Sequence, residues 1–168
     1  YNATLYPMTA DLSPATGHAV TGRVLALANT SGKVAGSAFT VIGCDVLING
    51  EVVATTGADG VFTIPSLAAG TYTATLSYAY GYDRDIQITV ADTDVDLGTY
   101  GMVVCNFKKD AAINGTDFNV YKRCTGKSKS DSTYNSACDF NHDGAVNGTD
   151  YNIYKAFSGK MLSAEIYN

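Results

Sequence analysis

The sequence predicts a mixed fold class, with an all-β two-sheet sandwich in the N-terminal part and an all-α C-terminal module of paired EF-type loop–helix repeats. Short blocks of alternating apolar and polar residues, separated by Gly, Asn and Asp, fill residues 18–104, which is typical of strands joined by turns. A segment that begins at Cys105 recurs 33 residues later at Cys138, and such a repeat indicates a duplicated structural unit. We therefore expect two domains, residues 1–102 and residues 103–168.

The composition limits the functional classes. Of the 168 residues, 46% are hydrophobic and only 16% are charged, against roughly 25% charged in an ordinary soluble domain, so the chain is expected to fold around a core. The net charge of −5 argues against nucleic acid as a partner, because phosphate binding needs clustered Lys and Arg. No run of about 18 apolar residues exists, so no membrane insertion is expected. The chain begins at Tyr1 without a basic and apolar leader, as expected of a mature or excised fragment.

Seven segments are expected to be strands, because turn residues separate them and their apolar residues alternate. They are residues 19–28, 40–48, 51–56, 61–65, 70–79, 85–91 and 95–102. Asn49-Gly50 joins two of these segments and predicts a tight hairpin, since both turn residues need a positive φ. Short strands at this spacing predict two packed sheets. Residues 1–17, which include Pro7 and Pro14, are expected to form an added edge strand or a tail.

The second repeat carries a pattern of oxygen-bearing residues that predicts a calcium site. Positions 1, 3, 5, 9 and 12 of a twelve-residue loop have carboxylate or amide side chains and position 7 offers a backbone carbonyl, the arrangement that surrounds Ca²⁺ in EF-type loops. These six residues are Asp139, Asn141, Asp143, Ala145, Asn147 and Asp150. Gly144 at position 6 allows the sharp turn, and the three carboxylates supply negative charge.

The first repeat is a degenerate copy of this loop. Its remaining oxygen-bearing residues are Asn106, Asp110, Asn114 and Asp117, while Lys108 stands at position 3 and Ala111 at position 6. A lysine ammonium beside a calcium ion would be repelled by roughly 8 kcal/mol at an effective dielectric constant near 20. We therefore expect this loop to bind Ca²⁺ weakly or not at all, with the Lys108 ammonium neutralising Asp110 and Asp117 instead.

Each loop is expected to lead into a helix that ends at a glycine. The helices are predicted over residues 116–125 and 149–158, with Gly126 and Gly159 after them, where glycine commonly terminates a helix. Aromatic residues three apart on each helix are expected to pack the helices together. Val120 and Ile153 lie off that stripe and are predicted to belong to a protein-binding surface.

Two such repeats, with the pattern Asp-x-Asn-x-Asp-Gly-x-Val-Asn-x-x-Asp in the second, resemble a dockerin module over about residues 103–168. The resemblance implies a calcium-dependent module that binds a cohesin domain of a scaffoldin. Its parent would thereby join a cellulosome-type assembly for polysaccharide degradation, secreted or attached to the bacterial cell surface, and would be a monomer when free. With Val120 and Ile153, the implied cohesin-binding residues are Gly115, Thr116, Lys122, Arg123, Gly148, Thr149 and Lys155. Their near-identity in the two repeats suggests binding in two orientations.

The sandwich part resembles carboxypeptidase regulatory-like and collagen-adhesin B-type domains over about residues 18–102, on the segments 43–49, 55–65 and 67–75. A sandwich directly before a dockerin is similar to the X-modules that support some dockerins. Tyr78, Tyr80 and Tyr82 alternate and suggest an alternative, a carbohydrate-binding platform. Burial of these rings between the sheets or against the dockerin is the other expectation.

Catalysis is not expected, because the two histidines, His18 and His142, form no recognisable Ser-His-Asp or Cys-His arrangement and His142 is expected to be a solvated spacer. The four cysteines lack the paired spacing of zinc ligands. Antiparallel helices would bring Cys124 close to Cys138, so a disulfide is possible there, which would leave Cys44 and Cys105 for a second one. Buried free thiols are the alternative.

Overall fold

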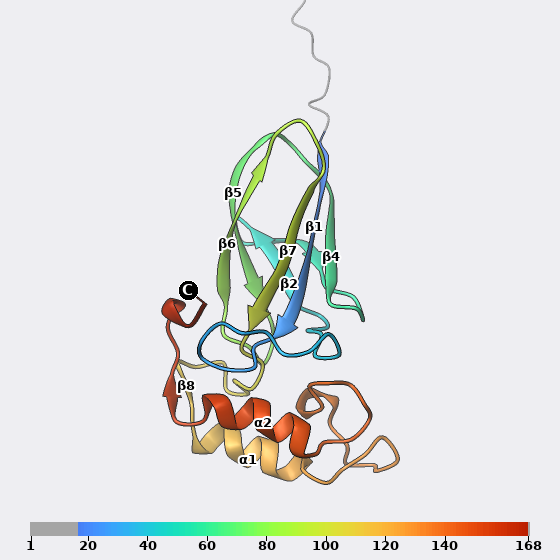
Figure 1. Ribbon diagram of the computed structural model, residues 1–168, viewed down its shortest axis with the longest axis vertical. Coiled ribbons are helices and arrows are strands. Elements are labelled where there is room, and N and C mark those ends of the chain that lie inside the picture. Colours follow the sequence, from blue (N-terminus) through green and yellow to red (C-terminus); the bar gives the residue numbers. More distant parts are fainter. Residues whose placement is uncertain (1–16, 168) are drawn as a thin grey trace, which may run out of the picture.

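The computed structural model describes residues 17–167. In this part of the chain the strands of an elongated sandwich occupy one end of the molecule, and two helices lie across the other end (Figure 1). The expectation for residues 1–17 falls outside the described residues, apart from Gly17. No helix within residues 17–167 is both long and apolar enough to cross a membrane.

The sandwich consists of two sheets. Its strands are β1 (His18–Ala26), β2 (Asp45–Ile48), β3 (Glu51–Thr55), β4 (Val61–Leu67), β5 (Gly70–Ser77), β6 (Arg84–Val90) and β7 (Val95–Met102). One sheet has the order β4-β1-β7, with β1 antiparallel to β4 and parallel to β7. The other sheet has the order β3-β2-β5-β6 and is antiparallel throughout.

Side-chain alternation and turn chemistry explain these strands. In β6, Ile86, Ile88 and Val90 are buried while the residues between them are exposed, which is the period-two pattern of a strand with one face on the core. The turn of the β2–β3 hairpin has φ values of 53° and 80° at Asn49 and Gly50, so the predicted tight hairpin is confirmed. These strands place the turn between β5 and β6 next to the C-terminal part.

The C-terminal part contains more than helices. Its elements are β8 (Ala112–Ile113), α1 (Gly115–Cys124), the 3₁₀ helix η1 (Ser136–Cys138), α2 (Gly148–Phe157), β9 (Lys160–Met161) and the 3₁₀ helix η2 (Ala164–Tyr167). Each α-helix has ten residues, and β8 pairs with β9 in a third sheet. The predicted fold class, with an all-α C-terminal module, is therefore wrong, since strands account for most of the regular structure in residues 17–167.

The physical reason is that each loop needs backbone partners where its apolar residue enters the core. Ile113 and Val146 are buried at the eighth position of the two loops, so the surrounding amides and carbonyls leave water and must be paired. The segment after α2 supplies the pairing for the first loop, where Gly159 N donates to Ile113 O at 2.8 Å. The segment after α1 does the same for the second loop, where Gly126 N donates to Val146 O at 2.9 Å.

The two repeats are thus related by an approximate two-fold arrangement. The Tyr121 hydroxyl of α1 donates to the carbonyl of Asn147, which precedes α2, at 3.1 Å. The equivalent Tyr154 of α2 donates to the carbonyl of Asn114, which precedes α1, at 3.3 Å. The rings of Tyr121 and Tyr154 stack with centroids 5.4 Å apart. The helices therefore hold each other through the same residues in both directions.

The cysteines have different fates. Cys124 at the end of α1 and Cys138 just before the second loop form a disulfide, with their Cα atoms 6.2 Å apart. Cys44 and Cys105 are free and buried, so the structure does not contain the second disulfide. The Cys44 sulfur instead faces Met102 Sδ at 3.9 Å, and burial raises the pKa of its thiol to about 12. The sandwich and the helices are joined by a shared apolar core rather than by a covalent staple.

Candidate functional site

The second repeat loop centres on two carboxylates that are fully buried, Asp139 and Asp150. Oδ2 of Asp139 accepts hydrogen bonds from the Tyr134 hydroxyl at 2.5 Å and from Gly144 N at 2.8 Å. Oδ1 of Asp139 is the one buried side-chain oxygen or nitrogen within residues 17–167 that lacks a hydrogen-bond partner. A buried carboxylate oxygen without a partner is costly, so it marks a place that suits a cation.

Asp150 sits at the start of α2 and closes the loop. Its Oδ1 accepts from Phe140 N at 2.7 Å and its Oδ2 accepts from Asn147 N at 2.9 Å, the second bond belonging to a capping box with Asn147. Burial raises the pKa of the Asp150 carboxyl, and the negative charge of Asp139 raises it further. Two buried carboxylates in one loop therefore repel each other, and a bound cation would remove that repulsion.

The other predicted ligands belong to the same loop, but their carboxylates do not gather around one point. Asp143 is exposed and accepts from Ala145 N at 2.9 Å and from Asn141 Nδ2 at 3.0 Å. Among the described residues, no three His, Cys, Asp or Glu side chains gather as a metal-binding group. Calcium also takes amide and backbone carbonyl oxygens, which Asn141, Ala145 and Asn147 carry. With the unpartnered Oδ1 of Asp139, this donor set fits a calcium ion.

In the first repeat loop, the buried polar side chains form their hydrogen bonds with groups of the loop itself. Asn106 is buried, its Nδ2 donates to Asp110 O at 2.7 Å, and its Oδ1 accepts from Asp110 N at 3.1 Å. The buried Asp117 accepts from Lys108 N at 3.2 Å and from Asn114 N at 3.0 Å. The prediction that the Lys108 ammonium neutralises Asp110 and Asp117 is wrong, because within residues 17–167 Lys108 forms no ion pair and only its backbone N–H contacts Asp117.

The fourth position of each loop contacts the sandwich. Lys109 Nζ forms an ion pair with Asp83 Oδ1 at 2.6 Å and donates to Tyr78 O at 2.6 Å. His142 stands at the same repeat position, and its Nε2 lies 2.9 Å from Thr40 O. Both residues have a positive φ, 55° and 56°, which turns their side chains out of the loops. His142 is therefore a contact between the domains and not a solvated spacer.

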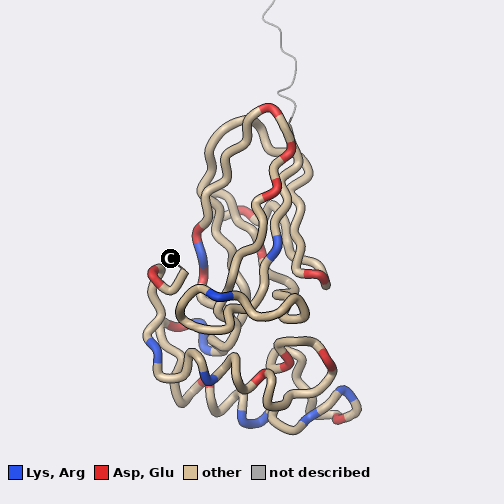
Figure 2. The backbone as a smooth tube through the Cα atoms, viewed as in Figure 1, with Lys and Arg blue, Asp and Glu red and all other residues tan. Residues whose placement is uncertain are grey.

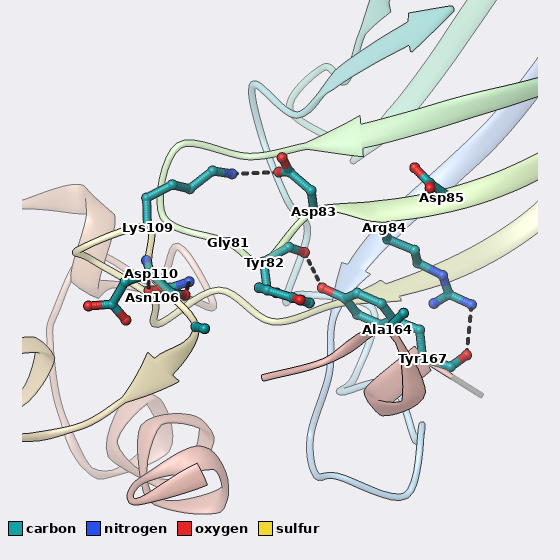
Figure 3. Close-up of a pocket in the computed structure, with 11 residues that line it drawn as sticks. Gly81, Tyr82, Asp83, Arg84, Asp85, Asn106, Lys109, Asp110, Ala164 and Tyr167 are labelled. Atoms are coloured by element: carbon teal, nitrogen blue, oxygen red, sulfur yellow. Dashed lines mark hydrogen bonds and ion pairs between the residues drawn. The ribbon is translucent and has the colours of Figure 1, made fainter. Parts of the chain in front are cut away.

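A cleft of about 600 Å³ lies where the sandwich, the first loop and η2 meet (Figure 3). Its side chains are engaged with one another. The Tyr167 hydroxyl donates to Tyr82 O, and the Arg84 guanidinium lies 4.9 Å from the centre of the Tyr167 ring and donates to Tyr167 O at 3.3 Å. Figure 3 shows these contacts beside the Lys109–Asp83 pair. The side chains that line the cleft therefore hold the C-terminal segment against the sandwich.

The three tyrosines suggested as a glycan platform do not form one. They lie in the turn between β5 and β6, so strand alternation does not place them on one face. The Tyr80 ring contacts Tyr78 edge-on at 5.6 Å and Phe107 at 5.8 Å, while Tyr82 stacks on Tyr167 at 6.3 Å. Their rings are thus used at the junction between the domains.

The helix positions predicted to bind a partner are exposed, with two exceptions. Thr116, Lys122 and Arg123 on α1, with Gly115, and Gly148, Thr149 and Lys155 on α2 all face solvent. Val120 is half-buried, and Ile153 is buried with 5% exposed. Ile153 packs in the core, which removes it from the proposed surface. Figure 2 shows basic residues along this helical end, which holds eight of the eleven Lys and Arg residues.

The aromatic residues that begin each helical stripe were expected to pack between the helices. Phe118 and Tyr151 occupy equivalent positions and remain 38% and 41% exposed. Each ring packs against a ring of the other helix. The ring centroids are 5.6 Å apart for Phe118 and Tyr154, and 6.0 Å apart for Tyr151 and Tyr121. Phe118 and Tyr151 add apolar area beside the exposed threonines and lysines. Their equivalent positions in the two repeats are the sequence signal that could have identified them as exposed surface residues.

Sequence reasoning also missed the contacts made by the segment between the repeats. The 33-residue repeat extends further than the loop–helix units, because Gly126-Lys127 and Tyr134-Asn135 recur as Gly159-Lys160 and Tyr167-Asn168. That extension would have indicated that the residues after each helix are structured. It would not have shown which loop they contact, since the pairing crosses from one repeat to the other.

Comparisons with known proteins agree with this geometry. Residues 107–157 match the family model of the dockerin type I domain. A chain of a type II cohesin–X-dockerin complex from Acetivibrio cellulolyticus, a C-terminal interface mutant, aligns with 27% identity and a TM-score of 0.65, covering 86% of this chain and 97% of that one. An N-terminal interface mutant of the same complex aligns with equal identity and coverage and a TM-score of 0.63. No curated protein matches the chain.

Proposed function

We propose that the dockerin type I domain at residues 107–157 binds a cohesin domain in a calcium-dependent manner and anchors its parent protein in a cellulosome-type extracellular assembly. The observation that carries the proposal is the alignment, through sandwich and helices together, with chains of cohesin–X-dockerin complexes at 27% identity. The domain limits proposed are residues 1–102 for the sandwich and 103–168 for the dockerin. The chain acts as an adaptor and not as an enzyme.

The binding surface proposed is the exposed side of α1 and α2. Thr116 and Lys122 on α1 have counterparts in Thr149 and Lys155 on α2, and the two-fold arrangement of the repeats presents both sets on the helical end. Arg123 extends the first set, and the buried Ile153 is left out. Either helix can then offer a similar face, which supports binding in two orientations.

Calcium has a structural role in this proposal. The ligands would be Asp139, Asn141, Asp143, Asn147 and Asp150 with the carbonyl of Ala145. Bound there, the ion would supply positive charge to two buried carboxylates, Asp139 and Asp150. The first loop is proposed to bind no ion, since the Asn106 amide already completes it. The proposed stoichiometry is one calcium ion per chain.

The sandwich supports the dockerin by holding both loops. Lys109 and His142 contact the sandwich from equivalent positions, and Asn106 N donates to Tyr80 O at 2.8 Å. A shared apolar core continues from Met102 through Cys105 to the helices. These contacts lie away from the exposed helix positions, so the sandwich can stabilise the dockerin without covering the proposed partner surface.

The test is surface plasmon resonance on immobilised type I and type II cohesins, with calcium and with EGTA. Both cohesin types are needed, because the family match is to type I whereas the aligned structures are type II complexes. We expect binding to one type in calcium and its loss in EGTA. Replacing Thr116, Lys122, Thr149 and Lys155 together by Ala should abolish it, whereas Lys33→Ala on the sandwich should not. Absence of binding to both types in calcium would contradict the proposal.

A further inference from the structure

The carboxylate of Asp139 is held in place partly by a residue outside its own loop. Of its two carboxylate oxygens, Oδ2 is occupied by two donors and Oδ1 has no partner. One donor, Gly144 N, belongs to the loop, but the other, the Tyr134 hydroxyl, comes from the segment between the repeats. A carboxylate held by two donors on one oxygen can present only the other oxygen to an ion without losing a hydrogen bond.

The segment that carries Tyr134 is fixed against the same loop. Val146 N donates to Lys127 O at 2.8 Å and Lys129 N donates to Gly144 O at 2.8 Å, so residues 127–129 run antiparallel to residues 144–146. Tyr134 N then donates to Asp131 O at 3.0 Å, and η1 leads to Cys138, which is bonded to Cys124. The phenol is therefore anchored on both sides of its contact with Asp139.

We infer that Tyr134 is a positioning residue for the calcium ligand Asp139, and that the segment between the repeats thereby forms the outer shell of the calcium site. The inference rests on the calcium binding proposed above. Partners that orient a ligand from outside commonly change metal affinity about 10–100-fold when they are removed. The Tyr134 hydroxyl acts by keeping Oδ1 of Asp139 directed into the loop before the ion arrives, which lowers the cost of ordering the ligand.

The repeat provides a matched control. Tyr167 is the counterpart of Tyr134, 33 residues later, but its hydroxyl donates to Tyr82 O and accepts from Val103 N at 3.4 Å. Tyr134→Phe and Tyr167→Phe therefore remove the same atom at the same repeat position. The first change removes a donor from Asp139, and the second removes a contact with the sandwich.

The experiment is isothermal titration of calcium chloride into the metal-free full chain, for the wild type and both variants. We expect Tyr134→Phe to weaken calcium binding about 10-fold or more and Tyr167→Phe to change it less than twofold. At saturating calcium, the unfolding temperature and cohesin affinity of Tyr134→Phe should equal those of the wild type. That separation distinguishes positioning from a general structural role, which would lower both even when the site is full.

Each outcome decides the inference. Calcium binding by Tyr134→Phe within twofold of the wild type overturns it while leaving the proposed calcium site intact. A Tyr134→Phe chain that stays unfolded, or loses stability or cohesin affinity at saturating calcium, also overturns it, because the residue is then structural. A wild-type chain that binds no calcium refutes the proposed site itself, and is recognised because the wild-type titration alone shows it.

Discussion

The two repeat loops agree in backbone conformation at their fourth position and before the helix, but Gly144 has a φ of 96° where Ala111 has no positive φ. They differ also in the hydrogen bonds of their first side chain. Asn114 and Asn147, which precede the two helices, have φ values of −140° and −138°. Yet Asn106 completes the first loop with its own amide, which both donates to and accepts from Asp110. Asp139 can only accept when ionised, and its Oδ1 has no partner. One amide in place of one carboxylate is thus one difference between the loops, beside Lys108 and Ala111 of the first loop, and only the second loop leaves a buried carboxylate oxygen without a partner.

The comparison also shows what the loops share. In both repeats a capping box joins the Asn before the helix to the Asp at its third residue. Asp117 and Asp150 each use both oxygens on backbone N–H groups. The helix starts are therefore organised in the same way in the two repeats. The loops differ instead at their first, third and sixth positions, before the helix start.

The largest expected effect comes from making the second loop resemble the first. Asp139→Asn removes a buried charge from the donor set, and calcium affinity depends steeply on ligand charge. We expect calcium affinity to fall by about two orders of magnitude or more, measured by calorimetry on the metal-free chain. Asp92→Asn is the control, because Asp92 is exposed and lies between β6 and β7 in the sandwich. An unchanged affinity in Asp139→Asn would show that the first loop position does not distinguish the repeats.

The reverse exchange should weaken the fold. Asn106→Asp puts a carboxylate where 1% of the residue is exposed and removes the hydrogen bond to the Asp110 carbonyl. An uncompensated buried charge costs about 3–5 kcal/mol, so in EGTA the free energy of unfolding should fall by about 3 kcal/mol, measured with urea. Calcium should restore part of it if the altered loop binds the ion.

The control for that exchange is Asn119→Asp, the same chemical change at an exposed position of α1. It should alter the free energy of unfolding by less than about 0.5 kcal/mol. If Asn106→Asp were equally harmless in EGTA, the Asn106 amide would not be what completes the first loop.

Much of the candidate site follows from the sequence because its signals are local. The six predicted ligand positions, which remain a prediction, and the observed helix starts and Asn49-Gly50 turn each depend on residues a few positions apart, so spacing and turn chemistry are informative. The contacts of Lys109, His142 and Tyr134 are not local in that sense. A lysine in a polar loop has many acceptors within reach, and only the docking of the sandwich selects Asp83 and Tyr78.

The incorrect all-α prediction has the same origin. Residues 127–129 and 160–162 are short and carry no alternation that would indicate a strand. They are extended because the neighbouring loop offers unpaired backbone groups beside Ile113 and Val146. Short pairings of this kind are determined by tertiary contact and not by propensity.

A smaller effect is expected where the first loop meets the sandwich. Lys109→Met removes the ion pair with Asp83 and the bond to Tyr78 O. The pair is partly exposed, with 38% and 48% of the two side chains accessible, so the free energy of unfolding should fall by about 1 kcal/mol. Lys108→Met is the matched control, since the exposed Lys108 ammonium has no ion-pair partner among residues 17–167. If the two changes lowered the free energy of unfolding equally, the contacts of Lys109 with the sandwich would not contribute to stability.

The smallest expected effect concerns the helix faces, where the repeats agree instead of differing. Replacing Thr116 and Lys122 by Ala leaves Thr149 and Lys155 exposed on α2, so a partner able to bind in either orientation retains a surface. A statistical loss of one of two equivalent orientations lowers affinity by about twofold, or about 0.4 kcal/mol. Cohesin titrations should show a loss of this size for either pair and abolition when both pairs are replaced. If replacing Thr116 and Lys122 alone abolished binding, one orientation would account for docking, and the asymmetry of the loops would extend to the surface.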